Sequence, residues 1–149
     1  MNIMKLPSLK HKTYALLEHG FDGSSYAKLV SGFIVLLIVG NVIAVILESY
    51  APISEKYQHV FHVFNLFSVI VFTIEYLTRV WICTESPEYT SLPSNRARLK
   101  YIVSPVALID FIAIVPFFLS FILPLDLRYL RMLRMLRLLK LTHYFKGLR

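Results

Sequence analysis

A basic residue occurs at every third position from residue 128 to residue 140, in a segment whose other residues are mostly apolar. The five members of this basic ladder are Arg128, Arg131, Arg134, Arg137 and Lys140. In an α-helix each step of three residues turns back by about 60°, so these charges spiral over about 240° of the surface. In a 3₁₀-helix the same spacing aligns them in one row. The pattern predicts a helix surrounded by other helices and by water-filled crevices.

Other interpretations of the ladder fit its spacing less well. A calmodulin-target helix or a helix on a lipid surface gathers its charges on one face, using spacings of three and four. A nucleic-acid contact would interleave the charges with polar residues, whereas Leu and Met separate them here. We therefore expect no nucleic-acid partner.

The composition indicates that the ladder belongs to a membrane protein. Hydrophobic residues make up 56% of the 149 residues and charged residues only 17%, where a soluble domain has about a quarter. The formal net charge is +7, and the ladder supplies five of the positive charges. The one cysteine, Cys83, excludes an internal disulfide bond and is predicted to be a packing residue. The region Met1–His19 is polar and basic and does not resemble a signal peptide.

Four hydrophobic segments predict an all-α membrane protein, an antiparallel bundle of four transmembrane helices. These helices are expected at about residues 27–49, 60–83, 101–123 and 126–146, after a cytoplasmic N-terminal segment at 1–26. Nineteen apolar-dominated residues of the first segment rise about 28 Å, close to a hydrocarbon core of about 30 Å. Within the N-terminal segment, residues 11–18 can form a short amphipathic helix on the inner membrane surface or a mobile tail.

Polar residues and prolines mark the expected connections between these helices. The first connection, residues 50–59, holds Pro52, and the second, residues 84–99, holds Pro87 and Pro93. A short turn at Pro124 joins the last two segments into an antiparallel hairpin, and Asp126 is expected to cap the fourth helix.

The basic residues near the helix ends predict the orientation in the membrane. They are concentrated in the N-terminal segment and in the second connection, whereas the first connection has only Lys56 and the turn at Pro124 has none. Both termini and the second connection should therefore be cytoplasmic.

The ladder is costly to place in lipid without partners. Each Arg or Lys at the centre of a membrane helix costs about 2.5–3.5 kcal/mol, so three of them cost about 8–10 kcal/mol. About ten apolar residues of the same segment return only about 3–6 kcal/mol in total. We therefore expect acidic residues inside the membrane on the neighbouring helices.

Two acidic residues occur at matching depths in the second and third segments. Glu75 lies eight residues before Cys83, about 12 Å from the end of its helix, and Asp110 lies ten residues after Lys100, about 15 Å from the start of its own. Both are predicted to be partners of the ladder in the inner half of the bilayer. The alternative for Glu75 is a local pair with Arg79, four residues on. Both interpretations hold if Arg79 snorkels to the interface while Glu75 turns inward.

Other residues of the first two segments are candidates for weaker roles. Glu48 lies at the outer end of the first segment and is expected to serve the outer arginines. Asn41 and Asn65 can line a hydrated crevice or bond between helices. Phe72 lies one turn from Glu75 on the same face, and by itself such a residue is usually part of the core.

Three motifs, taken with the ladder, resemble a known family. Residues 72–79 follow the pattern F-x-x-E-x-L-x-R, residues 109–116 follow an I-D-hydrophobic-P pattern, and residues 140–148 are similar to the end of a sensor helix and the start of a pore linker. Over about residues 26–149 the chain resembles the voltage-sensing domain of six-segment voltage-gated potassium channels, most like the bacterial members.

The resemblance implies that residues 27–149 form a voltage-sensing domain. In such a domain Phe72, Glu75 and Asp110 would form the charge-transfer centre, where Phe72 is a hydrophobic plug and the two acids bind each passing cation. The five ladder residues would be the gating charges. The linker to the pore would begin at Lys146, Gly147 and Leu148.

The sequence departs from the family pattern at two positions. The family often has an acid ten residues before the inner Glu of the second segment, where this chain has Asn65. Outer stabilisation would then rest mainly on Glu48, with Asn65 as a polar partner. The sixth ladder position is often Arg and is His143 here, whose charge would depend on pH near neutrality.

No hydrophobic hairpin and no TVGYG-like filter follow the ladder in this sequence. We expect a sensor separated from its channel, either truncated or naturally independent. Its expected partners are the lipid bilayer and the pore domain of a parent channel, which is tetrameric by the resemblance. The expected location is the plasma (inner) membrane, as a multi-pass protein without enzymatic activity, cofactor or metal.

Three rival functions remain from other classes. A voltage-gated proton channel would be expected to show an acid in the first helix, where Asn41 stands, and Asn after the third ladder Arg, where Arg137 stands. A sensor attached to a phosphatase would need a catalytic domain after Arg149. An ordinary four-helix membrane scaffold would show no voltage-dependent charge movement.

Overall fold

The computed structural model describes residues 9–18, 24–124 and 126–145, without the side chains of residues 18, 127, 143 and 145. Every regular element in this part of the chain is helical. The fold is thus the all-α membrane bundle that the hydrophobic segments predict.

The N-terminal region contains a short helix, α1 (Leu9–Glu18), which precedes the first long helix, α2 (Ser25–Glu48). The Ser24 side chain accepts a hydrogen bond from the Ala27 main-chain nitrogen, which satisfies one free donor at the start of α2. Lys10 of α1 donates a hydrogen bond to Thr84 and lies 3.9 Å from a Glu85 carboxylate oxygen. Of the two alternatives for residues 11–18, the structure has the helix, and its Lys10 contacts the residues that directly follow α3.

The second long helix, α3 (Ala51–Ile82), begins earlier than predicted and continues into a 3₁₀ turn, η2 (Cys83–Glu85). Residues 50–59, expected to be a loop, are largely helical because Pro52 stands in the first turn, where its missing N–H costs nothing. Tyr57 alone has non-helical dihedral angles there, φ −116° and ψ 20°, and marks a kink. Cys83 is buried, as a packing residue would be.

The helix expected at 101–123 is α5 (Pro105–Ile122), and a further helix, α4 (Ser94–Ile102), lies mostly within residues 84–99, which were expected to be a connection. The break falls at Ser104, whose ψ of 150° is extended because the ring of Pro105 disfavours a helical residue before it. The Ser104 hydroxyl then accepts a hydrogen bond from the Ala107 nitrogen and caps α5.

The fourth segment changes its helical type twice. It comprises α6 (Leu127–Arg134), a 3₁₀ stretch η3 (Met135–Leu138) and α7 (Leu139–Phe145). Asp126 occupies the N-cap position of α6, but its side chain makes no capping hydrogen bond, so this part of the expectation is wrong.

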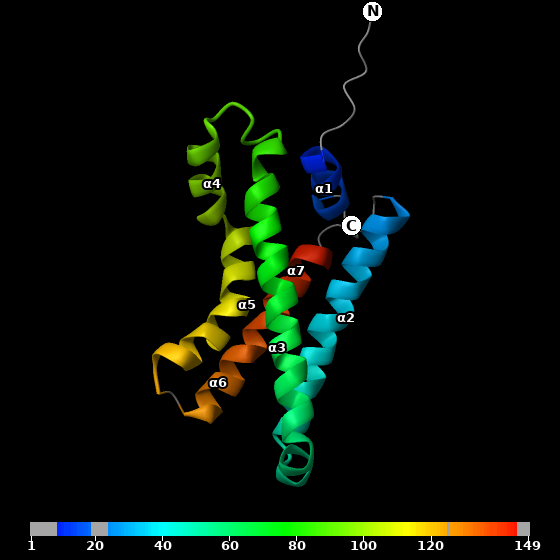
Figure 1. Cartoon of the computed structure of the whole chain (residues 1–149), viewed down its shortest axis with the longest axis vertical. Helices are drawn as coiled ribbons and strands as arrows, with labels where there is room; N and C mark the ends of the chain where they lie inside the picture. The colour runs from blue at the N-terminus through cyan, green and yellow to red at the C-terminus, as the bar shows by residue number, and fades with distance from the viewer. Residues whose placement is uncertain (1–8, 19–23, 125, 146–149) are drawn as a thin grey trace, which may run out of the picture.

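The four long segments run antiparallel in chain order, and α1 and α7 lie toward the same end of the bundle (Figure 1). We call this the α1 end, and the opposite end, where α2 turns into α3, the hairpin end. Among the described residues, three stretches are long and apolar enough to cross a membrane: Ser25–Glu48, Ala51–Glu85 and Pro105–Ile122. The fourth segment is absent from this set because it is divided into short helices and carries the ladder.

Apolar side chains form a buried core around Phe72. Phe72 is fully buried there and packs with Ile38, Val69, Ile114 and Tyr144. Large apolar side chains cover the outside, for example Leu29, Leu36 and Phe121, which are about 70% exposed or more. An apolar exterior around a sealed interior is the arrangement that a lipid environment requires.

Candidate functional site

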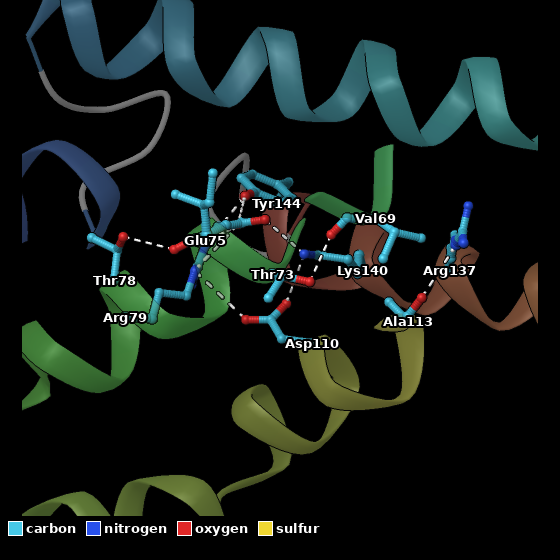
Figure 2. Close-up of polar contacts among 11 residues, drawn as sticks. Val69, Thr73, Glu75, Thr78, Arg79, Asp110, Ala113, Arg137, Lys140 and Tyr144 are labelled. Carbon is cyan, nitrogen blue, oxygen red and sulfur yellow. Dashed lines mark hydrogen bonds and ion pairs between the residues drawn. The ribbon is translucent and has the colours of Figure 1, made fainter. Parts of the chain in front are cut away.

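Four charged side chains from three segments meet in the interior of the bundle (Figure 2). We call Glu75, Arg79, Asp110 and Lys140 the central charge cluster. Their side chains are 3%, 3%, 2% and 0% exposed. Four ionised groups this deeply buried need close partners, because each loses its hydration.

Lys140 of α7 lies between the two acids. Its Nζ is 2.6 Å from Glu75 Oε2 and 3.3 Å from Asp110 Oδ1. Figure 2 shows the amino group pointing toward both carboxylates. The depth match deduced from residue counts therefore corresponds to a physical meeting of Glu75 and Asp110 at one ladder residue.

Arg79 completes the cluster from the side of the α1 end. Its guanidinium lies 3.0 Å from Glu75 Oε1 and 3.6 Å from Asp110 Oδ2. Two cations thus face two carboxylates, and the cluster is formally neutral. The local pair of Glu75 with Arg79 is present, but the expectation that Arg79 snorkels to the interface is wrong, because its side chain is 3% exposed. Contact with a second carboxylate explains why Arg79 stays inside.

The aromatic ring of Phe72 contacts two consecutive ladder residues, Arg137 and Lys140. The Lys140 Nζ lies 4.4 Å from the centroid of the Phe72 ring, and the Arg137 Cζ lies 5.9 Å from it. Both distances are within the range of a cation–π contact. Lys140 points toward the two acids, whereas Arg137 points toward the carbonyl oxygen of Ala113 (Figure 2).

Arg137 is held by neutral groups. Its Nε donates to the Ala113 carbonyl oxygen at 3.2 Å, and its Nη1 donates to the side-chain oxygen of Asn41. The Asn41 amide nitrogen in turn donates to the hydroxyl of Ser68 at 2.7 Å, which links α2 to α3. Asn41 therefore does form the bond between helices that was one of its expected roles, and it also receives a ladder residue.

The outer members of the ladder lie toward the hairpin end. Arg134 Nη1 lies 2.9 Å from Glu48 Oε2, and Arg131 Nη1 donates to the Glu48 main-chain oxygen at 3.1 Å. Arg128 is exposed, and no ion pair of it lies within the described part of the chain. A cavity of about 390 Å³ adjoins this contact, lined by Glu48, His59, His62, Arg131 and Arg134. We call Glu48 and Arg134 the peripheral pair.

Asn65 does not meet the ladder directly. It is buried, its side-chain oxygen accepts no hydrogen bond, and it lines a separate pocket of only about 10 Å³ together with Arg134 and Glu48. The structure thus brings Asn65 near the peripheral pair without a contact to a cation.

A second cavity, of about 730 Å³, lies at the α1 end. Arg79 forms part of its lining, together with Tyr89, Lys100 and Tyr101. The central charge cluster therefore has a cavity on each side, one reached through Arg79 and one beyond Arg134. The water-filled crevices predicted from the ladder spacing stay a prediction, and these two cavities are the spaces that they would occupy.

The 3₁₀ stretch η3 contains Arg137, the ladder residue whose guanidinium lies 5.9 Å from the centroid of the Phe72 ring. At three residues per turn, consecutive ladder residues fall on one side of the segment. Arg137 belongs to η3, with Arg134 just before it and Lys140 in the first turn of α7. The extent of 3₁₀ geometry could not be deduced from the sequence.

Tyr144 is a member of the site that the sequence did not indicate. Its hydroxyl donates to Glu75 Oε1 at 2.5 Å and accepts from Arg79 Nη2 at 3.1 Å. In the sequence, only its position four residues after Lys140 pointed to a place near the ladder.

The side chain of His143 and the expected linker residues Lys146, Gly147 and Leu148 lie outside the described residues. No group of acidic, His or Cys side chains suited to a metal ion occurs in the described ranges.

The comparisons with known proteins identify the family. Residues 27–149 match the family described as ion transport protein, and the chain belongs to it. A Rhodopseudomonas palustris protein named "Putative potassium channel protein RPA4233" is 36% identical over 140 residues. That match covers 94% of this chain and 34% of the relative, so the chain spans about a third of the relative's length. The family and the apolar helices make this an integral membrane protein of the ion transport family.

Proposed function

We propose that the chain is the voltage sensor of a voltage-gated potassium channel. The observation that carries the proposal is the position of Lys140, which lies between Glu75 and Asp110 while Arg137, one ladder step earlier, contacts the same Phe72 ring. A site that holds one ladder residue beside the next is suited to exchange them. Phe72, Glu75 and Asp110 are then the charge-transfer centre, and the ladder carries the gating charges.

The two cavities support this proposal electrostatically. One is lined by Arg79 and the other by Arg134, and neither is lined by Phe72, Arg137 or Lys140, so the part of the interior that holds these three residues is closed to both. If water fills both cavities, an applied potential falls mainly across this closed region, so a ladder residue that passes through it carries charge across the field. One charge across 100 mV is worth about 2.3 kcal/mol, and three or four charges supply about 7–9 kcal/mol. That exceeds the few kcal/mol that separate typical conformers.

The orientation we propose places the α1 end in the cytoplasm, as the distribution of Lys and Arg predicts. The four ladder arginines then lie on the outer side of the centre, with Lys140 in it. This is the arrangement expected at depolarised potentials, and a negative internal potential would draw the segment inward. The sensor would act on a pore domain through a linker that begins near Lys146, in a plasma membrane.

Gating-charge recording from the chain in a bilayer tests the proposal. We expect voltage-dependent charge movement, and we expect Arg134→Gln to lower the total charge by about a quarter to a third, since three or four charges move. Arg96→Gln, an exposed cation on α4, is the matched control and should leave the charge unchanged. No charge movement, or no loss after Arg134→Gln, would contradict the proposal. A proton current through the chain would favour the alternative, an independent voltage-gated proton channel.

A further inference from the structure

Tyr144 contacts the central charge cluster through a neutral group. Its hydroxyl lies between two charged partners, donating to Glu75 Oε1 at 2.5 Å and accepting from Arg79 Nη2 at 3.1 Å. Figure 2 shows the ring and hydroxyl directed at Glu75 from the fourth segment. The ring belongs to the apolar core that also contains Phe72, Ile38 and Ile114. Core packing and two hydrogen bonds together determine where the hydroxyl lies.

The two oxygens of Glu75 serve different partners. Oε2 faces Lys140, while Oε1 receives Arg79 and Tyr144. Because two cations already balance two acids, the hydroxyl adds a hydrogen bond without changing the charge of the cluster. Hydrogen bonds to charged groups are the strong ones in a low-dielectric interior.

The Tyr144 contact depends on the position of the fourth segment. A shift of one ladder step, which brings Arg137 to the place of Lys140, displaces Tyr144 by about 4.5 Å in an α-helix or about 6 Å in a 3₁₀-helix. Either displacement takes the hydroxyl out of hydrogen-bond range of Glu75. The two acids would still hold a cation, but they would lose the hydroxyl.

No other ladder residue has a hydroxyl in the equivalent place. The residues four positions after Arg128, Arg131, Arg134 and Arg137 are Met132, Met135, Leu138 and Leu141. Lys140 alone is followed at this spacing by a tyrosine. Each ladder cation can pair with Glu75 and Asp110 when it reaches the centre, but a tyrosine hydroxyl accompanies the cation only when that cation is Lys140.

We propose that Tyr144 is a positioning residue that selectively stabilises the sensor with Lys140 at the centre, by completing the hydrogen bonding of Glu75 and Arg79 in that state alone. A group that interacts with one of two states shifts their equilibrium by its differential free energy. The inference rests on the proposed function, since it requires the fourth segment to move.

Tyr144→Phe tests this role, because it removes the hydroxyl and keeps the ring in the core. In gating-charge recordings we expect the Lys140-centred state to lose about tenfold in population relative to its neighbour. For three charges crossing the field, tenfold corresponds to a midpoint shift of about 20 mV toward positive potentials. Total charge should be unchanged, and the inward movement should become faster. The matched control is Tyr129→Phe on α6, where the side chain is 62% exposed and the midpoint should not move.

A second variant moves the hydroxyl instead of removing it. Leu141→Tyr in the Tyr144→Phe background places a tyrosine four residues after Arg137. If the spacing to the central cation is what matters, the state with Arg137 at the centre gains the stabilisation, and exit from it should become several-fold slower than in the single variant. A purely structural role of Tyr144 gives no such transfer between states.

The outcomes separate this inference from the proposed function. Normal charge movement with an unshifted midpoint in Tyr144→Phe, or an equal shift in Tyr129→Phe, would overturn the role of Tyr144 and leave voltage sensing intact. Failure of Leu141→Tyr to slow exit from the Arg137-centred state would also overturn it. Absence of charge movement in the unaltered chain would instead refute the proposed function itself.

Discussion

The central charge cluster and the peripheral pair bind members of the same ladder in different ways. The central cluster uses two acids and an additional arginine, and its side chains are at most 3% exposed. The peripheral pair uses one acid, with side chains 17% and 21% exposed beside a cavity. The Glu48 main-chain oxygen serves Arg131 there, where the centre has a second carboxylate.

This difference follows from the cost of removing charges from water. A buried cation without a compensating acid costs several kcal/mol, whereas a pair that borders solvent is screened and contributes little. Between the two lies Arg137, held by an amide oxygen and a main-chain carbonyl and in contact with the Phe72 ring. The molecule therefore stabilises a ladder residue by two acids and full charge balance at the centre, by neutral dipoles one step away, and by one half-buried acid at the periphery.

The largest expected effect comes from removing one acid of the central cluster. Asp110→Asn leaves Lys140 and Arg79 with a single carboxylate, so one positive charge is buried without compensation. We expect a loss of about 3–5 kcal/mol in the free energy of unfolding. Thermal or denaturant unfolding in detergent micelles measures it.

Asp126→Asn is the matched control for this prediction. Asp126 is exposed at the start of α6 and its side chain makes no capping hydrogen bond. The same chemical change there should alter stability by less than about 0.5 kcal/mol. Equal losses in the two variants would show that burial of the acid is not what distinguishes the centre.

The sequence predicted the central cluster better than it predicted the helices around it. Intramembrane Glu75 and Asp110 are costly unless paired, so their depth along two helices was enough to bring them together at the ladder. The helix boundaries were harder to predict from the sequence, because a proline can either begin a helix or interrupt one, depending on its position. Pro52 stands in the first turn of a helix in the first connection, while Pro105 keeps Ser104 out of helical geometry and is the first residue of α5.

Neutral groups were the least predictable part of the site. A tyrosine in an apolar helix is usually core, and nothing in the sequence showed that the Tyr144 hydroxyl would reach Glu75. Asn41 gave a weak signal as a polar residue in an otherwise apolar segment, but its ladder partner depends on how α2 packs against η3. The burial of Arg79 was missed because its second partner, Asp110, lies on another helix.

An intermediate effect is expected for the dipolar position between the two regions. Asn41→Leu keeps a side chain of similar size and removes the oxygen that accepts from Arg137 Nη1. It also removes the donor to Ser68, so we expect a loss of about 1–3 kcal/mol in unfolding free energy. Asn95→Leu on the exposed face of α4 is the control for the added apolar surface. If Asn41→Leu lowers the unfolding free energy as much as Asp110→Asn does, the neutral partners of Arg137 stabilise it as strongly as the acids stabilise the central charge cluster, and the distinction between the two positions is wrong.

The smallest effect, and the sharpest test of the comparison, is expected at the peripheral pair. Glu48→Gln keeps the side chain size and removes one charge beside Arg134, so the loss should be at most about 1 kcal/mol. Salt should abolish it, because the screening length falls from about 10 Å at 0.1 M to about 3 Å at 1 M. The loss in Asp110→Asn should persist at both concentrations, since ions do not enter the closed interior. Unfolding of both variants and of the control Glu55→Gln at two salt concentrations measures this. A salt-resistant loss in Glu48→Gln would mean that the peripheral pair is electrostatically buried and that exposure does not separate the two regions.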